Sequence, residues 1–150
     1  MKLGVTGASG FLGGAIIKEA VKRGWKVVGF SRNLDTQIEG CTEIRQFSDV
    51  EVINLEGLDA VIHLAGESLF GLWTRDKKNK IRESRIQLTT DLVEVIRDMP
   101  RHTRPKVLVS ASAVGYYGDR ADVWQDEESD AGFGFLATIC RDWEAAAMEA

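Results

Sequence analysis

Cysteine, histidine and proline are scarce in this sequence, with two of each in 150 residues. Cys41 and Cys140 supply neither a disulfide framework nor the close spacing of a metal site. His63 and His102 do not complete a metal site either. We therefore expect no metal centre. A reducing, cytoplasmic environment is the default expectation for so few cysteines.

An excess of positive charge is also missing, because 23 acidic residues outnumber 19 basic ones and give a net charge of −4. A nucleic-acid-binding surface and a membrane-surface helix both usually need a basic face, so we expect neither partner. No apolar run approaches the roughly 18 residues that a spanning helix needs. Gly4, Gly7 and Gly10 interrupt the first segment, so we expect no signal-peptide core there.

What is present is an ordinary globular composition, 44% hydrophobic and 28% charged, in about one domain's length of chain. Hydrophobic patterns of strand and helix type alternate along it. We expect strands at residues 2–6, 25–30, 42–47, 59–64 and 106–110, and helices at 11–23, 74–99 and from about 133 onward. Residues 59–64 and 106–110 have the pattern of strands buried on both faces. This alternation predicts an α/β fold, a doubly wound parallel sheet with helices on both faces.

A glycine cluster between the first strand and the first helix carries the first functional signal. Gly7, Gly10 and Gly13 are spaced three residues apart. In that position glycines permit a tight turn, close approach of the backbone to a pyrophosphate, and close packing of helix on strand, while the helix N-terminus attracts the phosphates. No Gly-Lys-Ser/Thr follows, which excludes a P-loop. A purely structural turn is the alternative.

The end of the second predicted strand indicates which dinucleotide is bound. An NAD site usually places an acid there to accept hydrogen bonds from the ribose, but Ser31 and Arg32 occupy the position. A guanidinium can fork onto a 2′-phosphate, with Ser31 donating a further bond, which favours NADP over NAD. The alternatives are that Arg32 is a solvated loop charge and that Asp35 reaches the ribose.

Several motifs together resemble one family. TGASGFLG at residues 6–13, HLAG at 63–66 and SASAVGYYGD at 110–119 resemble an extended short-chain dehydrogenase/reductase. IRESR at 81–85 and GFLATICRDWEAAA at 134–147, with WT at 73–74 and GE at 66–67, resemble its atypical branch, the nucleoside-diphosphate-sugar epimerase-like family.

The resemblance implies a Rossmann fold that binds a nicotinamide dinucleotide along residues 63–67 and 110–112, at the carboxyl ends of two strands. Together with the glycine cluster and the second strand, it gives the expected cofactor-binding residues. They are Gly7, Ser9, Gly10, Phe11, Leu12, Gly13, Ser31, Arg32, His63, Leu64, Ala65, Gly66, Glu67 and Ser110.

The sequence departs from the wider family where proton transfer is concerned. Enzymes of that family use a Tyr-x-x-x-Lys pair on the last helix, in which the Lys lowers the pKa of the Tyr and holds the ribose. Here Leu136 and Cys140 align with the pair, and residues 133–149 contain no Tyr or Lys. Arg85 stands four residues before Thr89, where relatives usually carry an Asn. Of the usual four residues only Ser112 remains.

Ser112 and Tyr116 are therefore the candidate catalytic residues. Tyr116 and Tyr117 follow Ser112 in a loop expected to rim the site, and Arg85 or Arg32 is placed to lower a tyrosine pKa there. The competing interpretation is that these tyrosines only pack. Residues 75–80 are expected to form a solvent-exposed helix turn. Three other residues are expected to pack in the core and to take no part in catalysis. The three core residues are His63, Cys140 and Trp143.

The chain is expected to be one NAD(P)-binding domain over residues 1–150, without the later strands and substrate domain that relatives carry. A homodimer is a further expectation from the resemblance. Two functions remain open. The first is an NADP-dependent oxidoreductase or epimerase acting on an unidentified small molecule, with a nucleotide sugar as one option. The second is a non-catalytic NADP-binding sensor, which the missing Tyr and Lys would explain.

Overall fold

The computed structural model describes residues 1–48 and 53–150. Within them, five parallel strands form one sheet in the order β3-β2-β1-β4-β5. The strands are β1 (Lys2–Thr6), β2 (Lys26–Ser31), β3 (Glu43–Gln46), β4 (Ala60–His63) and β5 (Val107–Ser110). Thr6 pairs with Phe30 and His63, and His63 pairs with Ser110. The strands therefore end level, and their carboxyl ends share one edge of the sheet.

Helix α1 (Phe11–Lys22) covers one face of the sheet. Ile17 and Ala20 pack against the inward residues of β1 and β2, and Gly24 ends the helix region at φ +73° as the sequence predicts. Leu12 and Val21 are apolar residues of α1, but they are 58% and 46% exposed. The apolar residues of the helix therefore extend beyond the face that is buried against the sheet.

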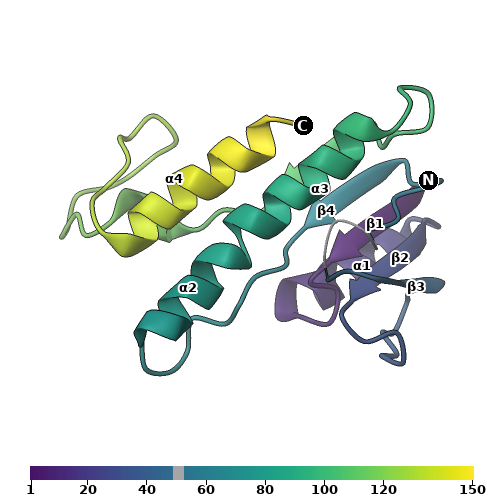
Figure 1. The fold of residues 1–150 in the computed structure, drawn as a ribbon, viewed down its shortest axis with the longest axis horizontal. Helices are drawn as coiled ribbons and strands as arrows, with labels where there is room; N and C mark the ends of the chain where they lie inside the picture. Colours follow the sequence, from purple (N-terminus) through teal and green to yellow (C-terminus); the bar gives the residue numbers. More distant parts are fainter. Residues whose placement is uncertain (49–52) are drawn as a thin grey trace.

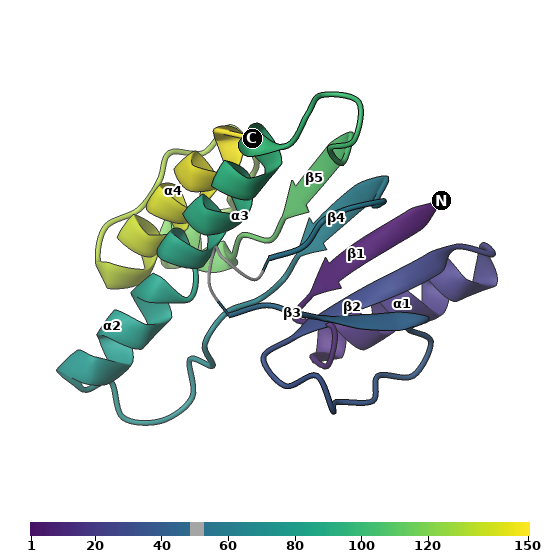
Figure 2. The ribbon, with the colours of Figure 1, turned by 45° about the vertical axis from the view of Figure 1, so that its right-hand side comes forward.

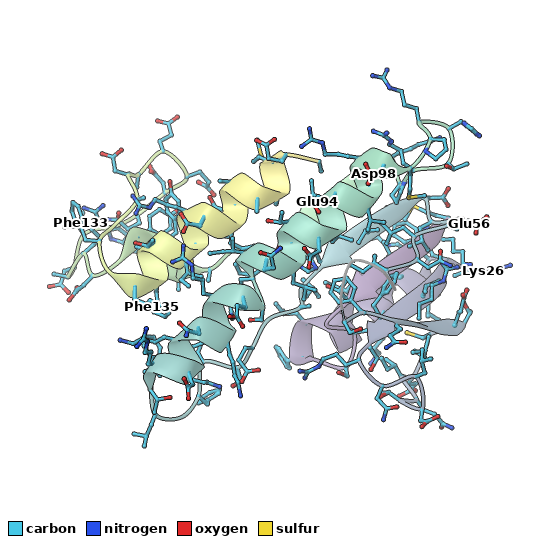
Figure 3. All side chains as sticks on the ribbon, viewed as in Figure 1. Lys26, Glu56, Glu94, Asp98, Phe133 and Phe135 are labelled. Atoms are coloured by element: carbon cyan, nitrogen blue, oxygen red, sulfur yellow. The ribbon has the colours of Figure 1, made fainter. Side chains whose placement is uncertain are left out.

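The opposite face is covered by α3 (Ile86–Asp98) and α4 (Phe135–Met148), which lie side by side (Figures 1 and 2). Leu92 and Ile96 of α3 are buried against the sheet, whereas Glu94 and Asp98 point into solvent (Figure 3). Helices thus lie on both faces of a parallel sheet, and the predicted Rossmann-type α/β fold is confirmed.

The long helix expected over residues 74–99 is two helices. α2 (Arg75–Glu83) is capped by Thr74, whose hydroxyl accepts a hydrogen bond from the Lys77 amide, and a turn at residues 84–85 separates α2 from α3. The apolar stripe stays in phase across the turn, so periodicity alone does not reveal the break. Side chains at this turn form hydrogen bonds with the chain that follows β4.

The expectation that residues 106–110 form a fully buried strand is wrong on one face. Val107 and Val109 of β5 are 52% and 51% exposed. β5 is an edge strand of the described sheet, and α1 packs mainly on β1 and β2. The same sequence pattern fits a strand covered on both sides, so burial depends on neighbours that the pattern does not contain.

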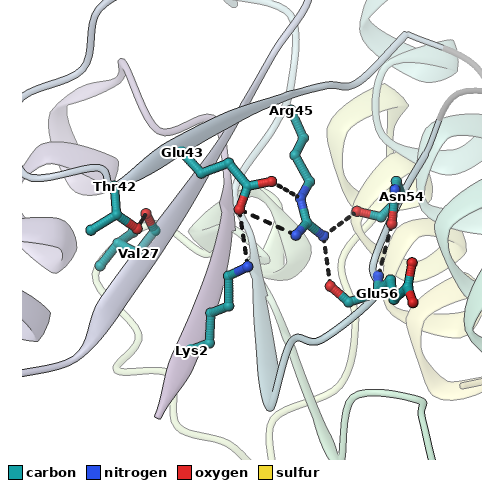
Figure 4. Close-up of polar contacts among 7 residues, drawn as sticks. All are labelled: Lys2, Val27, Thr42, Glu43, Arg45, Asn54 and Glu56. Carbon is teal, nitrogen blue, oxygen red and sulfur yellow. Dashed lines mark hydrogen bonds and ion pairs between the residues drawn. The ribbon is translucent and has the colours of Figure 1, made fainter.

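Charged side chains form hydrogen bonds along the opposite edge of the sheet, at β3. Glu43 accepts hydrogen bonds from Arg45 at 2.7 Å and from Lys2 at 2.9 Å, and Arg45 also donates to the carbonyls of Asn54 and Glu56 (Figure 4). These two cations lower the pKa of Glu43 to about 2. The cluster links β3 to the chain that leads into β4, and so fixes the strand that precedes Phe47. In the described residues no helix is long and apolar enough to cross a bilayer.

Candidate dinucleotide-binding site

The glycine turn after β1 has the geometry that the sequence predicts. Gly7 adopts φ +64°, and its carbonyl accepts a hydrogen bond from the Gly10 amide at 2.9 Å. Gly10 precedes the first residue of α1 without a side-chain cap, and the first turn of α1 carries no acidic residue. The amides at the start of α1 are therefore directed at the space beyond the strand ends, with nothing acidic on that turn to repel an anion.

The three glycines are required for different reasons. A β-carbon at Gly13 would lie 2.4 Å from the Gly7 carbonyl oxygen, and one at Gly7 would lie 2.9 Å from Leu64. Gly7 and Gly13 therefore allow the turn to pack against the helix and β4. A β-carbon at Gly10 would meet only the Gly7 carbonyl oxygen, at 3.1 Å. The open side of Gly10 is the side on which a pyrophosphate would approach.

A cavity of about 770 Å³ adjoins this turn. Nine of the predicted cofactor residues line it, namely Gly7, Ser9, Gly10, Ser31, Arg32, Leu64, Ala65, Gly66 and Glu67. Five others do not line it: Phe11, Leu12, Gly13, His63 and Ser110. Phe11 is nevertheless 93% exposed beside the turn. A cradle without β-carbons, a helix N-terminus and a polar-edged cavity of this size fit a dinucleotide.

Sequence analysis missed about half of the cavity wall. The missed residues come from the ends of β2 and β3 and from the α2–α3 region: Phe30, Asn33, Thr36, Phe47, Ser48, Glu83, Ser84, Gln87, Leu88 and Asp91. Phe47 is the last residue of a predicted strand and was recoverable, because the carboxyl ends of parallel strands share an edge. The residues of α2 and α3 carry no local signal, since they reach the cavity only through tertiary packing.

The loop after β2 forms the far wall of the cavity. The Ser31 hydroxyl donates to Thr36 Oγ1 at 3.2 Å and accepts from the Asn33 amide at 3.1 Å, which shapes the turn that presents Arg32. Arg32 is exposed on this wall and lies close enough to Glu67 to contribute to lowering the pKa of that carboxyl, after the larger effect of Lys77. Asp35 is exposed, and its amide is bonded to Asn33 Oδ1 at 2.9 Å.

His63 lies beneath the cavity in a chain of buried polar groups. Thr6 Oγ1 accepts hydrogen bonds from the amides of Leu64 and Ala65, so its hydroxyl proton is directed at His63 Nδ1, 2.7 Å away. His63 Nε2 then donates to Thr89 Oγ1 at 3.0 Å, and Thr89 donates to the carbonyl of Arg85. Burial lowers the pKa of His63 to about 4.

The His63 ring is fully buried and neutral, as its predicted place in the core requires. It joins the ends of β1 and β4 to the first turn of α3.

Glu67 is held from three sides at the α2–α3 turn. Its amide donates to Ser84 Oγ at 2.8 Å, its carbonyl accepts from Arg85 Nη1 at 3.0 Å, and its carboxylate pairs with Lys77 at 2.7 Å. Lys77 is therefore a half-buried partner of the cavity wall and not the solvated charge that residues 75–80 were expected to supply. These contacts explain why the chain breaks its helix at residues 84–85.

The end of β5 places the candidate catalytic residues outside the cavity. Ser112 is exposed, and its hydroxyl donates to the Glu144 carboxylate of α4. Tyr116 lies in the short 3-10 helix η2 (Val114–Tyr117), half-buried, with its ring 5.3 Å edge-on from that of Tyr117. Cys140 and Trp143 are both 4% exposed in α4, which confirms their predicted place in the core. At the start of α4, Phe133 and Phe135 lie far from Lys26 and Glu56 (Figure 3).

Level strand ends, a glycine turn leading into a helix and an adjoining cavity define a Rossmann-type domain with a dinucleotide-type site. The chain belongs to the NAD dependent epimerase/dehydratase family, whose profile matches residues 3–135. The resemblance drawn from its motifs, to an atypical epimerase-like branch of the extended short-chain dehydrogenases/reductases, is confirmed.

Three similar proteins place the chain within this family. The Epimerase family protein SDR39U1 homolog, chloroplastic, of Arabidopsis thaliana is 35% identical over all of this chain and 45% of its own length. The crystal structure of human epimerase family protein SDR39U1 (isoform 2) with NADPH is 28% identical, with a TM-score of 0.84 over 98% of this chain and 48% of its own.

The nucleoside-diphosphate sugar epimerase of Corynebacterium glutamicum is 35% identical, with a TM-score of 0.79 over 100% of this chain and 31% of its own. The chain thus spans less than half the length of each of these three relatives.

Proposed function

We propose that this chain is the cofactor-binding part of an NADP-dependent oxidoreductase or epimerase that acts on a small molecule of nucleoside-diphosphate-sugar type. The observation that carries the proposal is the cavity that joins the glycine turn to Ser31 and Arg32 without an acid at the end of β2. Support comes from the human relative, whose structure contains NADPH, and from the Corynebacterium relative, named for a nucleoside-diphosphate sugar.

Different residues along the strand ends are placed to bind different parts of the cofactor. Gly10 and the amides at the start of α1 are placed for the pyrophosphate, Ser31 and Arg32 for the adenosine and its 2′-phosphate, and residues 64–67 for the middle of the dinucleotide. The cofactor, when bound, supplies hydride transfer. The protein residues would position it across the strand ends.

Cofactor preference tests the proposal. We expect NADPH to bind more tightly than NADH, and Arg32→Ala to remove most of the preference, because a charge-assisted contact contributes about 1.5–3 kcal/mol. Calorimetric titration of both cofactors measures this. Arg101→Ala, the same charge change at an exposed position in the turn after α3, is the matched control and should leave the preference intact. Equal affinity of the unmodified protein for NADPH and NADH would refute the NADP assignment.

A second candidate, a non-catalytic NADP-binding module, is favoured by the composition of α4. Leu136 and Cys140 occupy the positions of the family's Tyr and Lys, and α4 carries neither residue type. Burial raises the pKa of the Cys140 thiol, which opposes its use as an acid or base near neutral pH.

Ser112 and Tyr116 separate the two candidates. If the protein is an enzyme, Ser112→Ala should lower turnover roughly 10²–10³-fold, the range for one lost donor to a developing oxyanion, with cofactor affinity unchanged. Tyr116→Phe should lower it about 10²–10⁴-fold only if the phenol transfers a proton. NADPH turnover with a panel of nucleoside-diphosphate hexoses is the assay. Binding of NADPH without turnover of any panel member supports the module instead.

A further inference from the structure

Arg85 places a half-buried positive charge beside the strand ends, between two elements of the site. Its guanidinium carbon would lie 3.1 Å from a β-carbon at Gly66, so a larger residue at that position would press on the guanidinium. On its other side the guanidinium stacks over the Trp143 ring of α4, 5.4 Å from the ring centre. Arg85 therefore fills the gap between the chain after β4 and the helix after β5.

Hydrogen bonds to carbonyl groups position the Arg85 guanidinium, but its charge has no ion-pair partner among the described residues. Nη1 donates to the carbonyls of Glu67 at 3.0 Å and Ile81 at 3.3 Å, whereas no acceptor within the described ranges 1–48 and 53–150 is bonded to Nε or Nη2. No carboxylate in those ranges forms an ion pair with Arg85, since Glu67 pairs with Lys77. Burial lowers the pKa of the guanidinium from its usual range, but it stays charged at neutral pH.

The fold determines what would reach these two donors. A dinucleotide lies across the strand ends with its adenosine on the β2 side and its pyrophosphate at the turn after β1. Its second nucleotide then extends past Gly66 toward β4 and β5, which is the side on which Arg85 lies. Cys140, at the position of the family's lysine, lies on α4 like Trp143, over whose ring the Arg85 guanidinium is stacked.

We propose that Arg85 binds the oxygen atoms of the nicotinamide nucleotide, its ribose hydroxyls and carboxamide, through Nε and Nη2. It thereby replaces, from the α2–α3 turn, the positive charge that relatives supply from the last helix. This inference rests on the proposed function, because it assumes that a nicotinamide dinucleotide is the ligand.

The test compares a ligand that contains the nicotinamide nucleotide with one that lacks it. Calorimetry with NADPH and with adenosine 2′,5′-bisphosphate is carried out on the unmodified protein, Arg85→Met and Arg85→Lys. Arg82→Met is the matched control, because Arg82 is an exposed arginine of α2 whose bond to Asp142 also links α2 to α4. Melting temperatures of all variants are measured alongside.

We expect Arg85→Met to weaken NADPH about 10- to 100-fold, the loss of a charge-assisted contact, and to change the bisphosphate by less than about 2-fold. Arg85→Lys should recover part of the NADPH affinity, and Arg82→Met should change neither ligand. The inference is overturned if Arg85→Met leaves NADPH unchanged or weakens both ligands equally, the second result being that of a merely structural contact to Glu67. If Arg85→Met does not fold, equal NADPH affinity of Arg85→Lys and the unmodified protein overturns it.

The two proposals fail in distinguishable ways. If the unmodified protein binds neither NADPH nor NADH, the proposed function fails and this inference falls with it. If it binds NADH instead, the comparison uses NADH and 5′-ADP, and Arg85 is tested in the same way. If it binds the cofactor and Arg85→Met behaves as a structural variant, only the role of Arg85 is lost.

Discussion

The three glycines of the turn after β1 have different structural roles, although they belong to one motif. Gly7 and Gly13 are needed because backbone atoms lie within 3 Å of where a β-carbon would stand, whereas Gly10 has space on its outer side. The spacing of the glycines was visible in the sequence, but the division of labour among them was not. For Gly7 the constraint comes from Leu64, which follows β4 more than fifty residues later in the chain.

His63 makes the stability of the domain depend on pH. Its pKa falls from the ordinary 6.5 to about 4 in the folded chain because the ring is buried. Between those values the unfolded chain binds a proton that the folded chain refuses, so stability is lost as the pH falls from about 6.5 to about 4. From pH 7 to pH 5 we expect the free energy of unfolding to drop by about 2 kcal/mol from this group.

Denaturant unfolding at the two pH values measures the effect. His63→Asn removes the titrating ring and should abolish this part of the drop, although the variant is less stable at pH 7 because Thr6 and Thr89 lose their partner. His102→Asn, at an exposed position, should retain the drop. A pH dependence that is the same in His63→Asn as in the unmodified protein would show that His63 is not buried in neutral form.

Secondary-structure elements were predicted well where a local pattern defines them and poorly where a neighbour does. The central strands, α1 and the carboxyl-end position of residues 63–67 follow from hydrophobic runs and glycine stops. The exposed face of β5 and the break between α2 and α3 do not, because the first depends on what covers an edge strand and the second on side chains that bond across to Glu67. About half of the cavity wall was missed for the same reason.

The α2–α3 turn yields a prediction about Ser84. Its hydroxyl accepts from the Glu67 amide at 2.8 Å and donates to the Ile81 carbonyl at 3.1 Å, in a half-buried position. Ser84→Ala leaves both groups without that partner, so we expect about 1–2 kcal/mol of lost stability in denaturant unfolding. Ser68→Ala removes one hydrogen bond in an exposed turn and should cost less than about 0.5 kcal/mol. Equal losses in the two variants would contradict the role assigned to the turn.

At the scale of the whole molecule, the resemblance to an epimerase-like family was readable because several motifs are distributed from the first strand to the last helix. The homodimer, the cytoplasmic location and the absence of a metal remain predictions. One relative is named as chloroplastic. The substrate of the complete protein also remains a proposal, because the chain spans less than half of the compared relatives.

The central claim is that the glycine turn holds a nicotinamide dinucleotide, and one calorimetric titration tests it most directly. NADPH is titrated into the unmodified protein, Gly10→Val and Gly14→Ala. We expect saturable binding at one site per chain in the unmodified protein and in Gly14→Ala, where a β-carbon meets nothing within 4 Å. Gly10→Val should fold, as judged by circular dichroism, but fail to bind, because its side chain occupies the approach of the pyrophosphate. Undiminished NADPH binding by Gly10→Val, or no binding by the unmodified protein, would contradict the account.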